Sequence, residues 1–130
     1  MKKTALGIVA LLGALAVVLG AFASHGLKES LEAEQLNSFQ TGIRYQLYHV
    51  FFLFILHLLP GISEKTKSLL YKLVLVGILL FSGSIYLLST REVTGIDISA
   101  VGWITPIGGT LLISAWLMLA FRYFSSKSDT

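Results

Sequence analysis

The chain has no cysteine and few charged residues, and both absences narrow the classes of protein to which it can belong. Without cysteine it has no disulfide framework, no thiolate metal site and no cysteine nucleophile. Charged residues make up 13% of its 130 residues, whereas soluble domains carry about 25%. Because so little charge cannot cover a water-soluble globule, the sequence predicts that a lipid bilayer is the solvent.

Motifs of known chemistry are missing as well. The sequence contains no Walker phosphate loop and no GxGxxG, HExxH or GxSxG pattern. Its net charge of +3 does not indicate nucleic-acid binding, because the basic residues lie at the ends of apolar segments rather than along one stripe. We therefore expect no nucleic-acid partner and no enzyme activity, and the sequence identifies no cofactor.

What the sequence does contain is four long apolar runs. A helix needs about 20 predominantly apolar residues to cross a bilayer. The runs predict spans at about residues 4–24, 41–60, 68–90 and 98–122. Because the connections are short, consecutive helices should be antiparallel neighbours. The predicted fold class is all-α integral membrane: a four-transmembrane-helix antiparallel bundle that forms a single domain over residues 1–130.

The connection between the first two spans has a pattern of its own. Leu27, Leu31 and Phe39 lie near helical spacing, with charged residues between them. This pattern predicts a short amphipathic helix lying on the outer membrane surface. The alternative is an ordinary solvated loop.

Local signals mark the ends of the other spans. Pro60 and Gly61 should break the second span. Ser63 is placed to cap the third helix, since serine side chains accept hydrogen bonds from the first free amides. Asp97 or Ser99 could cap the fourth helix in the same way.

Lysine and arginine indicate the orientation, because cytoplasmic loops are enriched in both. With the termini inside, seven of the ten basic residues fall on the cytoplasmic side and three fall outside. The inside set is Lys2, Lys3, Lys65, Lys67, Lys72, Arg122 and Lys127; the outside set is Lys28, Arg44 and Arg91. We therefore predict cytoplasmic N- and C-termini, in what should be a bacterial cytoplasmic (inner) membrane.

The first apolar run also has features of a secretory signal peptide. Two lysines precede it, and Ala21-Phe22-Ala23 resembles a cleavage site. The run is nevertheless longer than the 7–15 residues of the usual hydrophobic region of a signal peptide. The charge bias also favours four retained spans. We expect the segment to remain as the first membrane helix.

Polar and ionisable side chains occur within or beside the predicted spans, where they are costly unless they have partners. At the rise of a helix, about 1.5 Å per residue, several fall at a similar depth in the outer leaflet, with the others at or near the outer ends. We call this set the polar layer; it comprises His25, Tyr45, Gln46, His49, Ser84 and Thr105.

Two interpretations of the polar layer stay open. In the first, a neutral His49 bonds to a serine or threonine hydroxyl and holds the helices together, a contribution of about 0.6–2 kcal/mol. In the second, His25, His49 and Tyr45 form a binding or proton-handling site, since histidine titrates near neutral pH. No metal site is predicted, because His57 lies about 12 Å deeper than His49 and the histidine spacing matches no metal motif.

Small residues predict close packing between the helices, since lipid gives helices no hydrophobic reason to associate. Pro106, inside the fourth predicted span, should free the carbonyl of Gly102. The residues assigned to packing are Gly13, Gly20, Gly83, Pro106, Gly108 and Gly109. A substrate path or a homo-oligomer contact is the alternative use of the glycines.

Four short motifs resemble a known family. They are GAFASHGL at residues 20–27, YQLYH at 45–49, FSGSIY at 81–86 and TPIGG at 105–109. In this order and spacing they look like those of a family of small four-helix membrane proteins of unknown function, found in bacterial inner membranes and with a mitochondrial relative in animals. The resemblance implies four membrane helices and an uncleaved N-terminus, and it supplies no activity. Ala23 and Ala115 stand where the family often has glycine.

Three classes of function remain. We favour a non-enzymatic scaffold, assembly factor or regulatory subunit that contacts the bilayer and a homo-oligomer or larger membrane complex. The second class is a binder or carrier of a small solute, lipid or proton through an outer-leaflet pocket. The third is a membrane enzyme with a histidine base, although no motif places a nucleophile or a partnering carboxylate beside one.

Overall fold

The computed structural model describes residues 1–126, which form helices joined by short connections. The first helical segment joins α1 (Lys3–Phe22), a π-helical turn η1 (Ala23–Leu27) and α2 (Lys28–Ser30). The second is α3 (Ala33–Leu58), and the third joins α4 (Glu64–Ile78), a second π-helical turn η2 (Leu79–Gly83) and α5 (Ser84–Ser89). The fourth is α7 (Ile104–Ser125), preceded by α6 (Arg91–Thr94) and η3 (Ser99–Val101). Lys127 lies outside the described residues.

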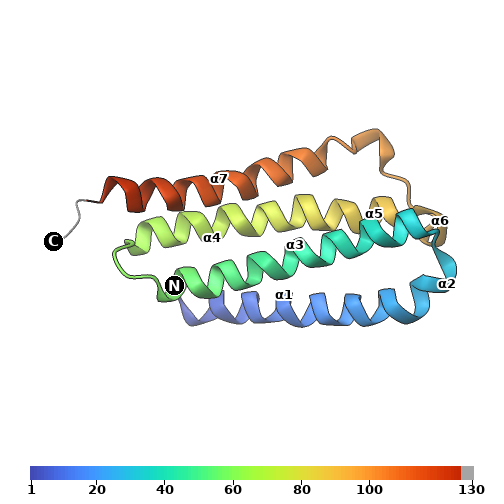
Figure 1. Ribbon diagram of the computed structural model, residues 1–130, viewed down its shortest axis with the longest axis horizontal. Helices are drawn as coiled ribbons and strands as arrows, with labels where there is room; N and C mark the ends of the chain where they lie inside the picture. The colour runs from blue at the N-terminus through green and yellow to red at the C-terminus, as the bar shows by residue number, and fades with distance from the viewer. Residues whose placement is uncertain (127–130) are drawn as a thin grey trace.

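The four long segments lie side by side and are linked at alternate ends (Figure 1). We call the end that holds Met1 and Pro60 the terminal end, and the end that holds Leu31 and Gly95 the loop end. Within residues 1–126, three segments are long and apolar enough to cross a membrane: Lys3–Ser30, Glu64–Ser89 and Ile104–Ser125. The predicted all-helical class is therefore confirmed for residues 1–126, with three candidate membrane-spanning segments. The span count of four and the antiparallel bundle stay predictions.

The second segment, α3, is not among these three candidates. Its last turns, from Val50 to Leu58, are strongly apolar, but Arg44, Gln46 and His49 lower the hydropathy of the turns before them. The buried core lies mainly between α3, α4 and α7, with Val9 from α1. Leu53, Leu56 and Leu70 are fully enclosed there.

The connection between α1 and α3 differs from the prediction. No separate amphipathic surface helix forms in this part of the described chain, because α2 continues α1 and only Leu31 and Glu32 separate it from α3. Leu27, Leu31 and Phe39 are instead buried together with Ala23. Their apolar side chains close the loop end of the bundle, where the two helices meet each other rather than the membrane surface.

The boundary between α3 and α4 agrees with the local signals. α3 ends at Leu58, before Pro60 and Gly61. The φ of Gly61 is 73°, a left-handed conformation that favours glycine. The Ser63 hydroxyl accepts a hydrogen bond from the Thr66 amide at 3.2 Å, which confirms the predicted cap.

The start of α7 differs from the predicted start of the fourth helix. The helix begins at Ile104 rather than near residue 98, so neither Asp97 nor Ser99 caps it. The Asp97 carboxylate instead accepts a bond from the Ser99 amide at 2.9 Å, which holds the pKa of that carboxyl below its usual range. Pro106 falls in the first turn of α7, where an amide has no helical acceptor. It frees no carbonyl: that of Gly102 accepts an amide bond at 3.3 Å.

Close helix contacts occur at some of the predicted glycines. A Cβ on Gly108 of α7 would lie 2.7 Å from the carbonyl carbon of Leu80 in η2, so only glycine fits there. A Cβ on Gly13 would lie 3.3 Å from the Val50 side chain, and one on Gly109 would make ordinary contact, 3.4 Å from the Phe81 ring.

At other glycines the structure differs from the predicted assignment to helix packing. Nothing lies within 4 Å of a Cβ built on Gly20 or Gly83, so helix packing requires glycine at neither position. Gly42 was not assigned to packing, yet a Cβ there would lie 2.7 Å from the ring of Tyr86. A glycine allows close helix packing only when it lies on the face that contacts another helix, so its presence in the sequence is not sufficient.

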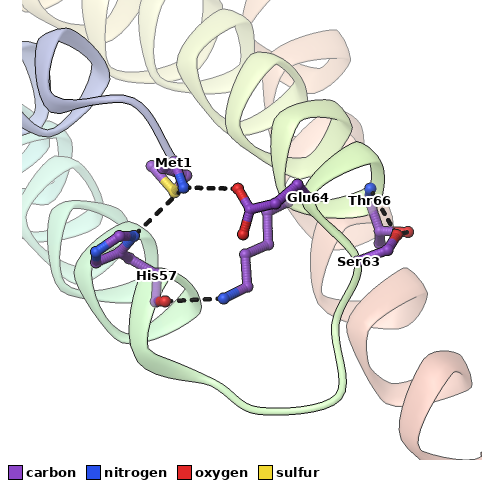
Figure 2. Close-up of polar contacts among 6 residues, drawn as sticks. Met1, His57, Ser63, Glu64 and Thr66 are labelled. Carbon is purple, nitrogen blue, oxygen red and sulfur yellow. Dashed lines mark hydrogen bonds and ion pairs between the residues drawn. The ribbon is translucent and has the colours of Figure 1, made fainter.

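Polar contacts tie the terminal end together (Figure 2). The Met1 amine lies 2.8 Å from a Glu64 carboxylate oxygen and 3.4 Å from Nδ1 of His57, so the start of α1 meets the end of α3 and the start of α4. Lys67 Nζ donates to the His57 carbonyl at 2.8 Å. The Tyr123 hydroxyl of α7 donates to the Pro60 carbonyl at 2.9 Å, which holds the fourth segment at the same end.

Candidate functional site

The residues of the polar layer do not form one layer. Ser84 bonds to Thr105 at the start of α7, whereas His49 bonds to Trp116. Trp116 lies about 16 Å further along the helix at 1.5 Å per residue. The polar side chains therefore divide into separate groups at different depths in the bundle.

The first group is centred on Gln46, which is 2% exposed. Its Nε2 donates to the Leu12 carbonyl of α1 at 2.7 Å, and its Oε1 accepts from the Tyr86 hydroxyl of α5 at 2.7 Å. Close by, the Ser82 hydroxyl donates to the Gly42 carbonyl at 2.7 Å. These bonds join three helical segments, through Gln46 and Ser82, which are buried, and Tyr86, which is half-buried.

The second group is centred on His49, which is 4% exposed. Its Nδ1 lies 2.7 Å from the Tyr45 carbonyl, and its Nε2 lies 3.1 Å from Nε1 of Trp116. A carbonyl only accepts and an indole N–H only donates. His49 is therefore the neutral tautomer with its hydrogen on Nδ1, and both ring nitrogens are occupied. The predicted hydroxyl partner of His49 is wrong, since the partner is the indole of Trp116.

A groove of about 310 Å³ lies beside His49 on the surface between α3 and α7. Its walls are mostly apolar and come from Tyr45, His49, Phe81, Leu112, Ile113 and Trp116. Trp116 is 50% exposed. The Phe52 and Trp116 rings meet edge to face with centroids 4.6 Å apart. The groove therefore places two residues of the polar layer, Tyr45 and His49, beside an open and mostly apolar space.

The third group lies at the second π-helical turn. The Ser84 hydroxyl is bonded to the Thr105 hydroxyl of α7 and contacts the carbonyls of Leu80 and Phe81. A π-helical turn disturbs the regular pattern of helical bonds, and Ser84 compensates two of the carbonyls of this turn. Ser84 and Thr105 thus join α5 to α7.

His25 is separate from all three groups. It is exposed in η1 near the loop end and makes no hydrogen bond within residues 1–126. At helical rise, His49 lies about 24 Å from the start of α3, and its ring faces Trp116 of α7. The structure therefore does not bring His25 to His49. Within the same residues, no group of three or more histidine, aspartate or glutamate side chains is placed to hold a metal ion.

Sequence reasoning missed Gly42, Ser82, Tyr86 and Trp116 as members of these groups. A signal for Trp116 was present: Thr105, Gly109, Leu112 and Trp116 follow each other at helical spacing and form one face of α7. The partner of that face depends on how α7 lies against α3, which no single helix pattern contains.

The helical fold, with its three candidate membrane spans, is that of the all-helical class of membrane proteins. A family model described as "Protein of unknown function (DUF423)" matches residues 19–109, and the chain belongs to this family. A UPF0382 membrane protein of Haemophilus influenzae is 44% identical over 98% of this chain and 99% of the relative.

Two further relatives carry the same family name. Membrane protein YwdK of Bacillus subtilis is 40% identical over 81% of this chain and 83% of its own length. Inner membrane protein YgdD of Escherichia coli is 30% identical over 85% of this chain and 81% of its own length. No solved structure matches the chain. The family is of unknown function, and none of these names states an activity.

Proposed function

We propose that the protein is a non-enzymatic scaffold, assembly or regulatory subunit, built as a four-span antiparallel bundle with both termini in the cytoplasm. One observation carries this proposal: two polar side chains buried in the middle of the bundle, Gln46 and His49, bond to the bundle itself. Gln46 uses both ends of its amide, and His49 uses both ring nitrogens. Polar groups that are hydrogen-bonded in this way fix the positions of the helices and are not available for catalysis.

The proposal requires α3 to be the fourth span. Its 26 residues extend about 39 Å at helical rise, longer than the ~30 Å hydrocarbon core. Its polar residues Gln46 and His49 are buried against neighbouring helices. Intramembrane polar groups are tolerated when they face a bundle interior and have partners, so low hydropathy does not bar α3 from crossing.

The basic residues support the orientation. Lys2 and Lys3 begin α1, Lys65 lies in the first turn of α4, and Arg122 lies in the last turn of α7, all at the terminal end. Lys28 lies toward the opposite end, in α2. Because the positive end of a membrane protein stays in the cytoplasm, the terminal end is the cytoplasmic end.

The histidines argue against catalysis. A general base needs a free nitrogen near a reacting group, and both nitrogens of His49 are occupied. His25 is exposed, and no carboxylate or hydroxyl orients its ring within the described part of the chain. A scaffold requires neither group to react.

Site-specific photo-cross-linking in intact membranes tests the scaffold proposal. Val17 of α1 and Leu117 of α7 are 66% and 65% exposed on the two outer helices, so a cross-linker at each position samples a different face. We expect one face to give a discrete product whose mass fits a second copy or one constant protein partner, with the other face as the matched control. Lipid adducts alone from both positions would contradict a scaffold role.

The groove beside His49 favours a second candidate function, a binder or carrier of a small apolar solute or lipid. The groove, of about 310 Å³, is open at one side, and the half-exposed ring of Trp116 is accessible to a ligand there. His49→Gln separates the two functions. Loss of ligand binding in a bundle of unchanged melting temperature supports the carrier, whereas a lower melting temperature alone supports the structural role.

A further inference from the structure

The helices α1 and α4 both begin at the terminal end (Figure 1). A second groove, of about 480 Å³, lies there between them. It is lined by Lys2, which directly precedes α1, by Thr4, Ala5 and Ile8 of α1, and by Ser68, Tyr71 and Lys72 of α4. Met1 and Glu64 border it. It is distinct from the groove beside His49, which lies between α3 and α7.

The groove carries uncompensated positive charge. Lys2 and Lys72 are exposed along it. Among the described residues, the carboxylate of Glu64 is already paired with the Met1 amine at 2.8 Å, and no carboxylate pairs with Lys2 or Lys72. Lysine ammonium groups bind phosphate as point charges, so this pair favours an anion in the mouth of the groove.

Hydroxyl groups add hydrogen-bonding capacity beside the two lysines. Thr4 and Ser68 are exposed along the groove. The Tyr71 hydroxyl is buried and has no hydrogen-bond partner in the described residues, and its side chain lines the same groove. A buried hydroxyl without a partner is unfavourable.

The other part of the lining is apolar and identifies the kind of anion. Ala5 and Ile8 lie beyond Lys2 along α1, toward the middle of the bundle, and Ile8 is 41% exposed. A groove with positive charge at the membrane surface and apolar walls further in matches an amphipathic ligand. Basic pockets between membrane helices bind the headgroups of anionic lipids.

We propose that this groove binds an anionic phospholipid, with the phosphate between Lys2 and Lys72 and an acyl chain along Ala5 and Ile8. The ligand is a lipid of the leaflet at the terminal end. A free phosphate would share the contacts to the lysines but would gain nothing from the apolar walls. The site is independent of the scaffold proposal, since it uses none of the polar-layer residues.

Lipid titration of the full chain in neutral detergent tests the proposal, with the melting temperature and native mass spectrometry as readouts. Phosphatidylglycerol should bind and raise the melting temperature, whereas phosphatidylcholine and inorganic phosphate should not. Lys2→Gln with Lys72→Gln should weaken phosphatidylglycerol binding about 25-fold, since each lysine near an anionic lipid is worth about fivefold. Lys3→Gln with Lys65→Gln is the matched control, because it removes the same charge from the same two helices outside the groove.

Ser68→Leu keeps the charge and fills the groove from an exposed position, so it should abolish lipid retention in a folded protein. Three results would overturn the proposal. One is equal binding of the two lipids, and another is equal loss in the control variant, which would indicate surface charge alone. The third is a full melting-temperature shift with inorganic phosphate alone, which would indicate a free-anion site.

Discussion

Replacing Gly108 with alanine should destabilise the bundle more than alanine at any other glycine of α1 or α7. The added Cβ would lie 2.7 Å from the carbonyl carbon of Leu80 and would also collide with the amide of Phe81. Both neighbours are backbone atoms of η2 and cannot rotate aside, so α7 must move away. Overpacking costs up to about 3 kcal/mol, and alanine recovers about 1 kcal/mol of helix propensity. We expect a net loss of about 2 kcal/mol.

Reversible unfolding in mixed micelles, followed by circular dichroism, measures this loss. Gly20→Ala is the matched control, because nothing lies within 4 Å of a Cβ at that position in α1. It should be neutral or stabilising by up to about 1 kcal/mol. If Gly108→Ala and Gly20→Ala change the free energy of unfolding equally, α7 does not pack on η2 as the structure has it.

The remaining predictions concern a buried hydroxyl, the His49 contact and the topology. Tyr71→Phe should raise the free energy of unfolding by about 1 kcal/mol in lipid-free micelles, because it removes a buried hydroxyl without a hydrogen-bond partner. A lower free energy of unfolding in the same assay would show that the hydroxyl has a partner. Trp116→Phe should lower that free energy by about 0.6–1.7 kcal/mol and should shift the nitrogen-15 resonance of His49 Nε2. An unchanged resonance would refute the hydrogen bond between Trp116 and His49. Since the chain has no cysteine, single cysteines at Asn37 and Ser63 should react with an impermeant thiol reagent from opposite sides of the membrane; labelling from one side would show that α3 does not cross.

Sequence alone predicted the features that depend on neighbouring residues. The helical segments follow from the apolar runs, and the break between α3 and α4 follows from Pro60 and Gly61. The Ser63 cap needs only the amide of Thr66, three residues away. Each of these signals acts within a few residues, so no knowledge of the packing was required.

The features that were missed depend on contacts between segments. Leu27 and Phe39 have the spacing of a surface helix, but each finds a buried apolar neighbour at the loop end. Gly83 and Gly108 are both small residues in predicted packing motifs, yet only Gly108 faces another backbone. The residue pattern along one helix predicts that the helix has a packing face. It does not predict which other segment packs against that face.

The polar layer was misplaced for a related reason. The second span was predicted to begin at about residue 41, whereas α3 begins at Ala33. His49 therefore lies much further from the loop end than predicted, and it meets Trp116 rather than His25. The types of polar residue were recognised correctly, but their partners depend on the register between helices.

The central claim is that the buried polar residues serve the bundle itself, and a double-mutant cycle between Gln46 and Tyr86 tests it most directly. Gln46→Leu, Tyr86→Phe and the double variant would be unfolded in the same micelles, with the free energy of unfolding as the readout. The 2.7 Å bond between the two side chains predicts a coupling of about 0.6–1.7 kcal/mol. Fully additive effects of the two substitutions would contradict the claim.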